Sequence, residues 1–145
     1  DFSRPSNYEL ELTDINKVVN EAVEITKVGT KAKDIIFETD LAKDVPMLPL
    51  IADQIQQVFV NILLNAVDAI AEKKRDGKTN KISVVSVNGG DEITLTFSDT
   101  GTGIRGTGLG LWVSYGIIKS FQGDIKIKSK INEGTTFIIK LPTEL

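Results

Sequence analysis

The sequence lacks both cysteine and histidine over its 145 residues. The absence of cysteine excludes disulfides, thiolate nucleophiles and the usual Cys/His zinc sites, and it is compatible with a reducing compartment. The absence of histidine excludes the commonest general base and the Ser-His-Asp arrangement, and it means that no residue of this chain can form phosphohistidine. Any catalytic chemistry therefore rests on other side chains or involves a residue outside the chain.

Strong net charge and long apolar runs are also missing. Lys and Arg number 17 against 20 Asp and Glu, a formal net charge of -3, so we expect no nucleic-acid-binding face. No segment approaches the roughly 18 consecutive apolar residues of a membrane-spanning helix, so we expect a soluble domain with no direct membrane insertion. The length suits one domain, and 41% hydrophobic residues suffice for a core. The polar start without Met predicts a domain taken from a longer protein.

Hydrophobic periodicity predicts three helices and five strands. Helices are expected over residues 14–27, 53–73 and 111–121, the first capped by Thr13 or Asp14 and the last ended by Gly123. Strands are expected over residues 34–40, 81–87, 92–98, 125–130 and 136–141. The proline-marked segment 45–49 is predicted to be a connection, and the glycine pair within residues 88–91 predicts a hairpin. The expected fold class is an α/β (α+β) two-layer sandwich, with a mixed, mostly antiparallel sheet and helices on one face.

A polar stripe runs along the helix predicted over residues 53–73. At about 100° per residue, Gln57, Asn61, Asn65 and Asp68 fall on one narrow stripe beside a broad apolar face. The middle of the helix is otherwise apolar almost all round, so the stripe requires a polar partner. Buried carboxamides are often satisfied core groups, and for such a pair alone the structural interpretation is favoured.

Two glycine-rich clusters lie farther along the chain, over residues 99–104 and 106–111. Taken singly, the first could be a plain turn, and a glycine-rich entry to a helix is weak evidence. Together with the stripe they predict a binding site, because glycines allow close approach of a ligand and the N–H groups at a helix N-terminus favour a phosphate chain. The spacing is neither the Walker motif nor the dinucleotide fingerprint, because no Gly-Lys-Ser/Thr follows and no parallel βαβ unit surrounds it.

The same residues offer partners for a nucleotide and its metal ion. A triphosphate normally arrives with Mg²⁺, which prefers oxygen ligands and keeps several waters. The amide oxygen of Asn65 suits that role, with Asn61 and Asp68 near enough on the stripe to orient water or to bind. Asp99, at the end of a predicted strand, offers an acceptor for an exocyclic amine such as that of adenine.

The three clusters resemble the N, G1 and G2 boxes of the Bergerat-fold ATPases, shared by histidine kinases, type II topoisomerases, Hsp90 chaperones and MutL repair proteins. The boxes span residues 57–66, 99–104 and 106–111, and a closing stretch runs from Gly134-Thr135-Thr136-Phe137 to Leu141-Pro142. The most similar subgroup is the catalytic ATP-binding domain of two-component sensor histidine kinases. The resemblance implies such a domain over residues 14–142. Residues 1–13 would then be a junction from preceding dimerisation helices, since Phe2-Ser3-Arg4-Pro5 is similar to that junction.

The resemblance also implies a role for each matching position. Asn65 would coordinate Mg²⁺, and Asn61 would lie close to the metal and phosphates, so both are expected at the catalytic centre. Asp99 would accept a hydrogen bond from the adenine amine of ATP or ADP, with Thr135 near the same ring through a water. Asp68 is included with the binding residues, at a position that is often polar or basic in the kinases. The other expected residues of the nucleotide pocket are Gly101, Gly103, Ile104, Gly106, Thr107, Gly108, Leu109, Gly110 and Leu111.

One departure from the family pattern is plain. The family separates its G1 and G2 boxes by a mobile ATP lid of roughly twenty residues, whereas only Arg105 stands between Ile104 and Gly106 here. Either the lid is deleted in this chain, or the sequence as numbered omits lid residues that order only around a ligand, which is the explanation we favour. If the lid is truly missing, nucleotide affinity and phosphotransfer are both in doubt.

The function implied by the resemblance is that of a protein histidine kinase. The domain would bind Mg-ATP and donate the γ-phosphate to a histidine on a separate dimerisation and phosphoacceptor domain, for signalling to a cognate response regulator in the cytoplasm. The isolated domain is expected to bind nucleotide without autophosphorylating. Two alternatives stay open: an ATP-gated chaperone or MutL-like ATPase module, which has a glutamate base where Asn61 stands, and a protein serine kinase of the same fold.

Overall fold

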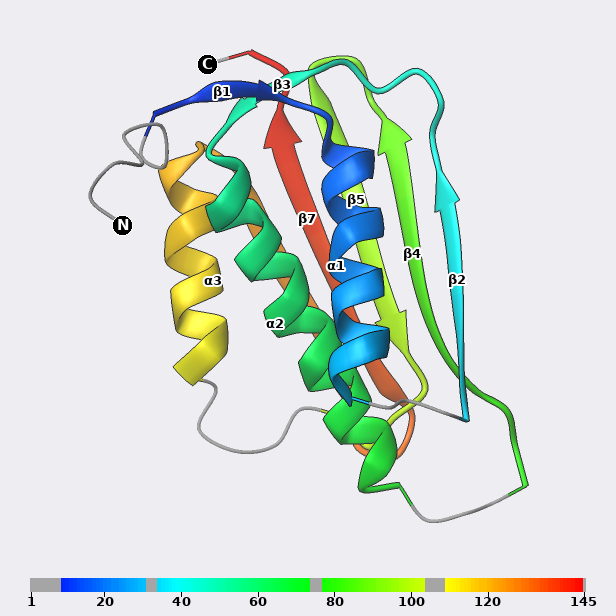
Figure 1. The fold of residues 1–145 in the computed structure, drawn as a ribbon. Coiled ribbons are helices and arrows are strands. Elements are labelled where there is room, and N and C mark those ends of the chain that lie inside the picture. Colours follow the sequence, from blue (N-terminus) through cyan, green and yellow to red (C-terminus); the bar gives the residue numbers. More distant parts are fainter. Residues whose placement is uncertain (1–8, 31–33, 74–76, 104–108, 145) are drawn as a thin grey trace.

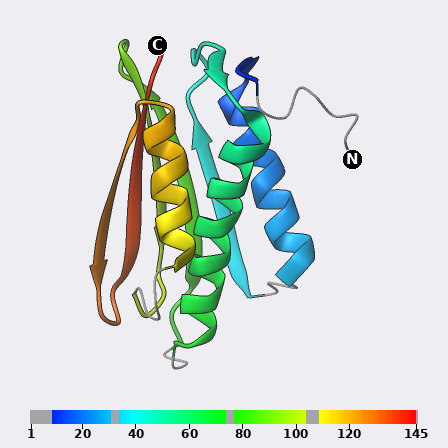
Figure 2. The same cartoon turned by 90° about the vertical axis from the view of Figure 1, so that its left-hand side faces the viewer.

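The computed structural model describes residues 9–30, 34–73, 77–103 and 109–144 of the chain. Three helices pack against one face of a five-stranded sheet, and no helix or strand of this described part covers the other face (Figures 1 and 2). In chain order the elements are β1 (Glu11–Thr13), α1 (Ile15–Thr30), β2 (Ile35–Leu41), β3 (Leu48–Leu50), α2 (Ala52–Ala71), β4 (Asn80–Asn88), β5 (Glu92–Asp99), α3 (Leu109–Ser120), β6 (Asp124–Lys130) and β7 (Gly134–Pro142). The predicted two-layer sandwich is confirmed.

The sheet has the strand order β2-β4-β5-β7-β6. β2 and β4 are parallel, and the three other neighbouring pairs are antiparallel, so the prediction of a mixed, mostly antiparallel sheet is confirmed. The predicted hairpin joins β4 to β5. Its turn depends on Gly90, which has a positive φ of 89° and donates its N–H to Asn88 Oδ1 at 2.9 Å.

A small second sheet forms where the sequence predicted only a connection. β1 and β3 pair antiparallel, with Leu12 opposite Pro49. Proline is tolerated there because each strand of a two-stranded ribbon is an edge strand. Thr13, Leu48 and Leu50 turn their side chains inward and are buried. Strands of three residues give too short an alternation to be recognised in the sequence, so this ribbon was missed.

One hydrophobic core lies between the helices and the sheet. Phe59 of α2 packs against Phe97 of β5 with ring centroids 5.2 Å apart, and both side chains are buried. The predicted apolar face of α2 is confirmed by its buried residues, which are Ile55, Val58, Phe59, Ile62, Leu63, Ala66, Ala69 and Ile70. Among the described helices none is long and apolar enough to cross a membrane. The core thus holds α2 over the central strands.

The ends of the helices identify their caps. Asp14 Oδ1 accepts hydrogen bonds from the backbone N–H groups of residues 16–17 at 3.1 and 3.3 Å, so Asp14 caps α1. At the end of α3 the left-handed residue is Gln122, with φ 62°, rather than Gly123. Gly123 closes the helix by donating its N–H to the Ile118 carbonyl at 3.0 Å.

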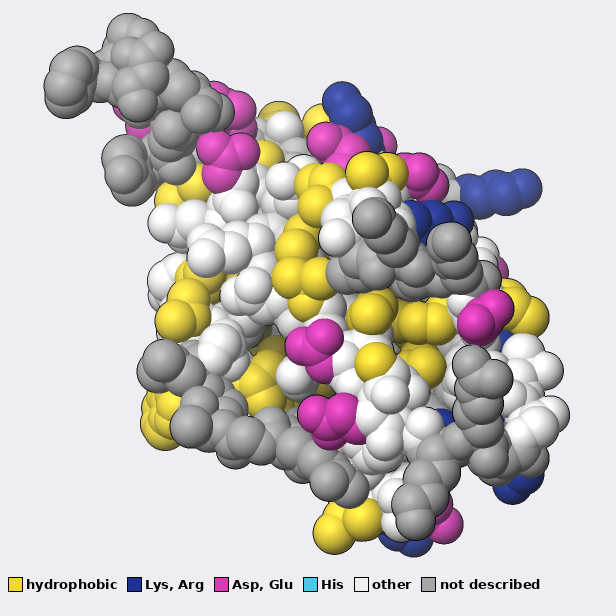
Figure 3. All heavy atoms as spheres, turned by 60° about the horizontal axis from the view of Figure 1, so that its bottom comes forward, with side chains coloured by type: hydrophobic (Ala, Val, Ile, Leu, Met, Phe, Trp, Pro, Cys, Tyr) yellow, Lys and Arg dark blue, Asp and Glu magenta, His cyan; other side chains and the backbone are white. Residues whose placement is uncertain are grey.

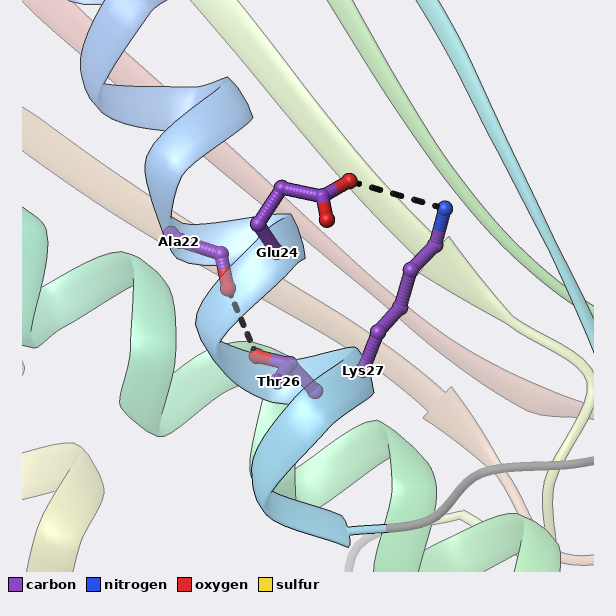
Figure 4. A network of polar contacts seen from close by, with 4 residues as sticks. All are labelled: Ala22, Glu24, Thr26 and Lys27. Atoms are coloured by element: carbon purple, nitrogen blue, oxygen red, sulfur yellow. Dashed lines mark hydrogen bonds and ion pairs between the residues drawn. The ribbon is translucent and has the colours of Figure 1, made fainter.

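Helix α1 carries a fully buried polar side chain, that of Thr26. Thr26 is 1% exposed, and its hydroxyl donates to the carbonyl of Ala22 at 2.8 Å (Figure 4). The bond to the preceding turn satisfies the hydroxyl inside the helix. On the solvent side Lys27 Nζ lies 3.8 Å from Glu24 Oε1, an exposed pair that contributes little to stability.

Candidate functional site

Asp99 is the last residue of β5 and the first residue of the predicted G1 box. Its Oδ1 accepts a hydrogen bond from the backbone N–H of Gly101 at 2.8 Å. Burial raises the pKa of the Asp99 carboxyl above its ordinary value, and hydrogen bonds from the backbone of Gly101 and Thr135 partly offset that rise. A carboxylate has about four acceptor sites, so Asp99 keeps acceptor capacity for a further donor.

The loop after Asp99 is anchored to helix α2. Thr102 donates to the carbonyl of Ala69 twice, from its backbone N–H at 3.1 Å and from its hydroxyl at 3.3 Å. A Cβ placed on Gly101 would lie 2.6 Å from the Ala69 Cβ, so only glycine fits against the helix there. These contacts bring the G1 box onto the C-terminal part of α2, beside the predicted N box.

Asn61 and Asn65 lie two turns and one turn before Ala69 on the same side of α2. Both are half-buried, and neither side chain has a hydrogen bond to another described residue, whereas Asp68 and Gln57 are exposed. The apolar middle of the helix is not buried all round, since Leu64 is 36% exposed. The stripe therefore borders solvent next to the G1 box, with its amide oxygens available to a ligand.

These amides fit a magnesium ion that is bound chiefly by phosphate and water. Mg²⁺ prefers oxygen ligands and is usually held through one or two protein groups plus substrate phosphates. Asn65 supplies one such oxygen from a packed helix. Among the described residues no three His, Cys, Asp or Glu side chains gather as a metal site, so an all-protein cage is not formed by this part of the chain.

The opposite wall of the G1 loop comes from β6 and β7. Gly103 has φ 97°, and a Cβ on it would lie 2.9 Å from Ser129 Oγ. The Ser129 hydroxyl lies 3.2 Å from Thr135 Oγ1, and Thr135 stands opposite Asp99 in the β5–β7 register. The sequence motifs assigned no role to Ser129, which lies outside the boxes, or to Thr102, which lies inside the G1 box, because their contacts form only when different elements pack together.

Helix α3 begins in the second glycine cluster. Leu109 is its first residue, and a Cβ on Gly110 would meet no described atom within 4 Å. Leu111 is partly buried against the hydrophobic core. The predicted site residues Ile104, Gly106, Thr107 and Gly108 lie outside the described residues. No described atom thus fills the space beside Gly110 in the first turn of α3, and the N-terminus of a helix favours an anion.

Figure 3 looks onto the end of the molecule at which α1 and α2 finish. A hollow opens on this face with hydrophobic side chains in it and acidic side chains beside it, while Lys and Arg side chains lie toward the margin of the view. A separate shallow groove of about 510 Å³ follows α1 and is lined by Asp14, Asn16, Lys17, Asn20, Glu21 and Glu24. That groove contains none of the predicted site residues.

Comparisons with known proteins show the family of the chain. The family described as histidine kinase-, DNA gyrase B- and HSP90-like ATPase matches residues 51–145. Sporulation kinase E of Bacillus subtilis is 27% identical over 97% of this chain and 21% of its own length. The signal transduction histidine-protein kinase AtoS of Escherichia coli is 30% identical over 98% of this chain and 25% of its own length. This chain thus spans a quarter or less of these two relatives.

Solved structures share the fold. The nucleotide-free catalytic domain of histidine kinase ThkA superposes with a TM-score of 0.79 at 22% identity, covering 94% of this chain and 99% of that one. Full-length ShkA in complex with AMPPNP gives a TM-score of 0.75 at 17% identity over 92% of this chain and 31% of its own. Because the family match covers most of the chain and includes all three boxes, the chain belongs to the family of histidine kinase-, DNA gyrase B- and HSP90-like ATPases, whose domain binds ATP.

Proposed function

We propose that this domain binds Mg-ATP and presents the γ-phosphate to a histidine on a separate helical domain. The observation that carries the proposal is the contact of Thr102 and Gly101 with Ala69, which holds the loop after Asp99 against α2, the helix that bears Asn61 and Asn65. The relatives' names, which include sporulation and sensor histidine kinases, support this class of activity.

Each end of the nucleotide has a candidate partner. Asp99 would accept from the adenine amine, and Thr135, its neighbour on β7, would approach the same ring through a water. The amides at the start of α3 would face the phosphates, with Gly110 leaving room beside the helix. Asn65 would hold the magnesium ion, with Asn61 one turn away and Asp68 at the exposed rim. Magnesium would neutralise phosphate charge when bound.

The chemistry left to the chain is positioning and charge neutralisation. Phosphoryl transfer needs an in-line acceptor and stabilised phosphate oxygens, with little covalent work by the protein. The sequence has no histidine, so the phosphorylated residue and its base lie on another domain. The proposed partners are the dimerisation and phosphoacceptor helices of the same protein and a cognate response regulator, with the reaction in the cytoplasm.

The short connection between the G1 and G2 boxes bears on affinity. The alignment with sporulation kinase B of Bacillus subtilis runs over 162 positions and covers all 145 residues, so at least 17 positions (162 minus 145) of that relative have no counterpart here. This number is close to the length of the expected lid. Intact-mass measurement separates the two explanations: a mass near 15.8 kDa means a true deletion, and a larger mass means residues omitted from the numbering.

The clamp-type ATPase alternative is weakened by Asn61. An amide cannot take a proton from water, and Asn61 occupies the position of the glutamate base in those ATPases. Hydrolysis by this chain is therefore expected to be very slow. Brisk turnover of ATP, measured as phosphate release, would favour the clamp alternative over the kinase.

Calorimetry tests the site assignment. ATP and ADP are titrated, with and without Mg²⁺, into the wild-type chain and into Asn65→Ala and Asp99→Asn. We expect Asp99→Asn to weaken both nucleotides by about 10-fold or more, since a hydrogen bond to a charged group contributes roughly 1.5–3 kcal/mol. Asn65→Ala should weaken mainly the magnesium-dependent part of binding. Unchanged binding in both variants would overturn the assignment.

Transfer is tested separately with radiolabelled ATP. The isolated domain should not become labelled, whereas a supplied phosphoacceptor helix domain should. Stable labelling of the isolated domain by the γ-phosphate would refute the proposal that the phosphorylated residue lies on another domain.

A further inference from the structure

The sheet face that no described helix covers carries an ordered charge pattern. On this face β2 presents the acidic side chains of Glu38 and Asp40. β6 presents the basic side chains of Lys126, Lys128 and Lys130, and all five are exposed. The strand order places β2 and β6 at opposite edges of the sheet. One edge of this face is therefore acidic and the other is basic.

The strand register places these charges at the two ends of the same rows. One row runs Asp40, Val85, Thr96, Ile138 and Lys126. The next row runs Glu38, Ser83, Ser98, Thr136 and Lys128. Between the terminal charges both rows contain only hydroxyl and branched apolar side chains, all half-buried. These two rows thus carry charge only at their ends. Elsewhere on the same face Lys81 of β4 pairs with Glu38, and Lys140 of β7 pairs with Glu92 of β5.

Two of these five charges have an ion pair. Glu38 Oε2 lies 3.4 Å from Lys81 Nζ, and Lys130 Nζ lies 3.7 Å from Glu133 Oε2. Asp40, Lys126 and Lys128 have no ion pair among the described residues. Charged side chains on edge strands oppose edge pairing, but either sign serves that purpose. Protection of the edges therefore does not account for the separation of signs.

We propose that this open face is a self-association surface for a second copy of the same chain. A twofold axis parallel to the strands turns one copy so that its β2 edge faces the β6 edge of the other. Glu38 and Asp40 of each copy then lie over the lysines of its partner, and the uncharged rows pack against each other. The interface is isologous and closes after two copies.

The size of the face fits a weak, salt-sensitive dimer. Five strands about 4.8 Å apart and seven residues of about 3.3 Å each give roughly 500 Å² per copy, or about 1,000 Å² in total. That total is at the low end for specific protein interfaces. Attraction between exposed opposite charges is screened at high ionic strength, so association should weaken as salt rises.

The surface is separate from the proposed nucleotide site. Side chains alternate between the two faces along a strand, and those of Asp99 on β5 and Thr135 on β7 lie on the helix-covered face. The association therefore goes beyond the proposed function, and nucleotide affinity should be the same in monomer and dimer.

Charge reversal tests the proposal. Sedimentation velocity of the full chain, in a concentration series up to about 1 mM at low salt, should show reversible dimerisation. The double variant K126E/K128E and the double variant E38K/D40K should each dimerise at least about 10-fold more weakly. An equimolar mixture of the two should regain association as a heterodimer. The control K17E/K43E has the same change of net charge as K126E/K128E, at residues outside the two rows, and should behave as wild type. Far-UV circular dichroism and ATP affinity verify that each variant is folded.

Zero-length carbodiimide cross-linking tests the orientation. Within one chain the β2 and β6 edges are four strand spacings apart, about 19 Å, so a bond between Asp40 and Lys126 forms only between copies. We expect this cross-link, or the one between Glu38 and Lys128, in the dimer fraction. A wild-type chain that stays monomeric throughout the series would overturn the proposal. It would also be overturned by dimerisation equal in all variants, or by a dimer without these cross-links.

Discussion

The two faces of the sheet contrast in composition and in what they determine. The covered face presents Ile82, Val84, Leu95 and Phe97, all nearly inaccessible to solvent, to the helices. The open face presents hydroxyl and half-buried apolar side chains together with charged ones, which include the Lys140–Glu92 pair. Burial of apolar area drives folding, so the covered face should determine stability and hold the candidate site in shape. The open face should tolerate substitution without loss of the fold.

The largest expected loss of stability comes from a substitution in the core on the covered face. Phe59→Ala removes a fully buried ring that packs on Phe97, and it should lower the free energy of unfolding by about 3–5 kcal/mol. Ile138→Ala on the open face removes a half-exposed side chain and should cost about 1 kcal/mol or less. Urea denaturation measures both. Similar costs for the two variants would show that the faces do not differ as argued.

Substitutions of Gly101 in the G1 box and Gly110 in the G2 box separate effects on packing from effects on nucleotide binding. A methyl group on Gly101 would collide with Ala69, so Gly101→Ala should lower stability by about 1–3 kcal/mol and weaken nucleotide binding as well. Gly110→Ala meets no described atom, and alanine favours helix, so stability should stay equal or rise by up to about 1 kcal/mol. Thermal denaturation and calorimetry report the two effects. Weakened binding of Gly110→Ala without lost stability would mark a ligand-facing position.

Asp99 is a titratable group on the covered face, and the pH dependence of stability tests that it is buried there. Burial raises its folded-state pKa, so its contribution to stability is fully present below the unfolded pKa of about 3.9 and is lost as pH rises through the raised folded value. The stability of the wild type relative to Asp99→Asn should therefore fall over that pH window. Nucleotide affinity should rise over the same window, because the ionised carboxylate accepts a stronger hydrogen bond from an amine than the neutral acid does. A stability difference independent of pH would contradict the buried carboxyl.

The smallest expected effect belongs to the open face. Lys140 Nζ lies 3.7 Å from Glu92 Oε1, and both side chains are more than 40% exposed. Lys140→Ala should change the free energy of unfolding by less than about 0.5 kcal/mol, with the small cost reduced further at high salt. Urea denaturation at two salt concentrations measures it. A cost above about 1 kcal/mol would mean that the open face contributes more to stability than its exposure indicates.

Most of the fold could be predicted because its signals are local. The helical spacing from Ile55 to Ile70, the alternation in β5 and the glycine pair before Asp91 each depend on neighbours a few residues away. The ribbon of β1 and β3 could not be predicted, since three-residue strands carry almost no periodicity. The end of α3 was assigned to Gly123, although Gln122 adopts the left-handed conformation.

Some features of the candidate site could be predicted from local motifs, and others depend on tertiary contacts. The positions of Asn61, Asn65 and Asp99 followed from motif and spacing, since all three belong to recognisable boxes. The contacts of Thr102 with Ala69 and of Ser129 with Thr135 join residues 33 and 6 positions apart, on different elements. No local pattern indicates such partners.

The sequence by itself determined that this chain contains no histidine, so the proposed phosphotransfer needs an acceptor histidine from outside the chain; a residue count requires no folding to interpret. It also determined the order of the three boxes. Only the tertiary structure decided that Thr102 anchors the G1 box on α2 and that acids and lysines occupy opposite edges of one open face. The reason is that burial and register are set by contacts between distant segments, and a charge in a sequence acquires its neighbours only when the strands pair.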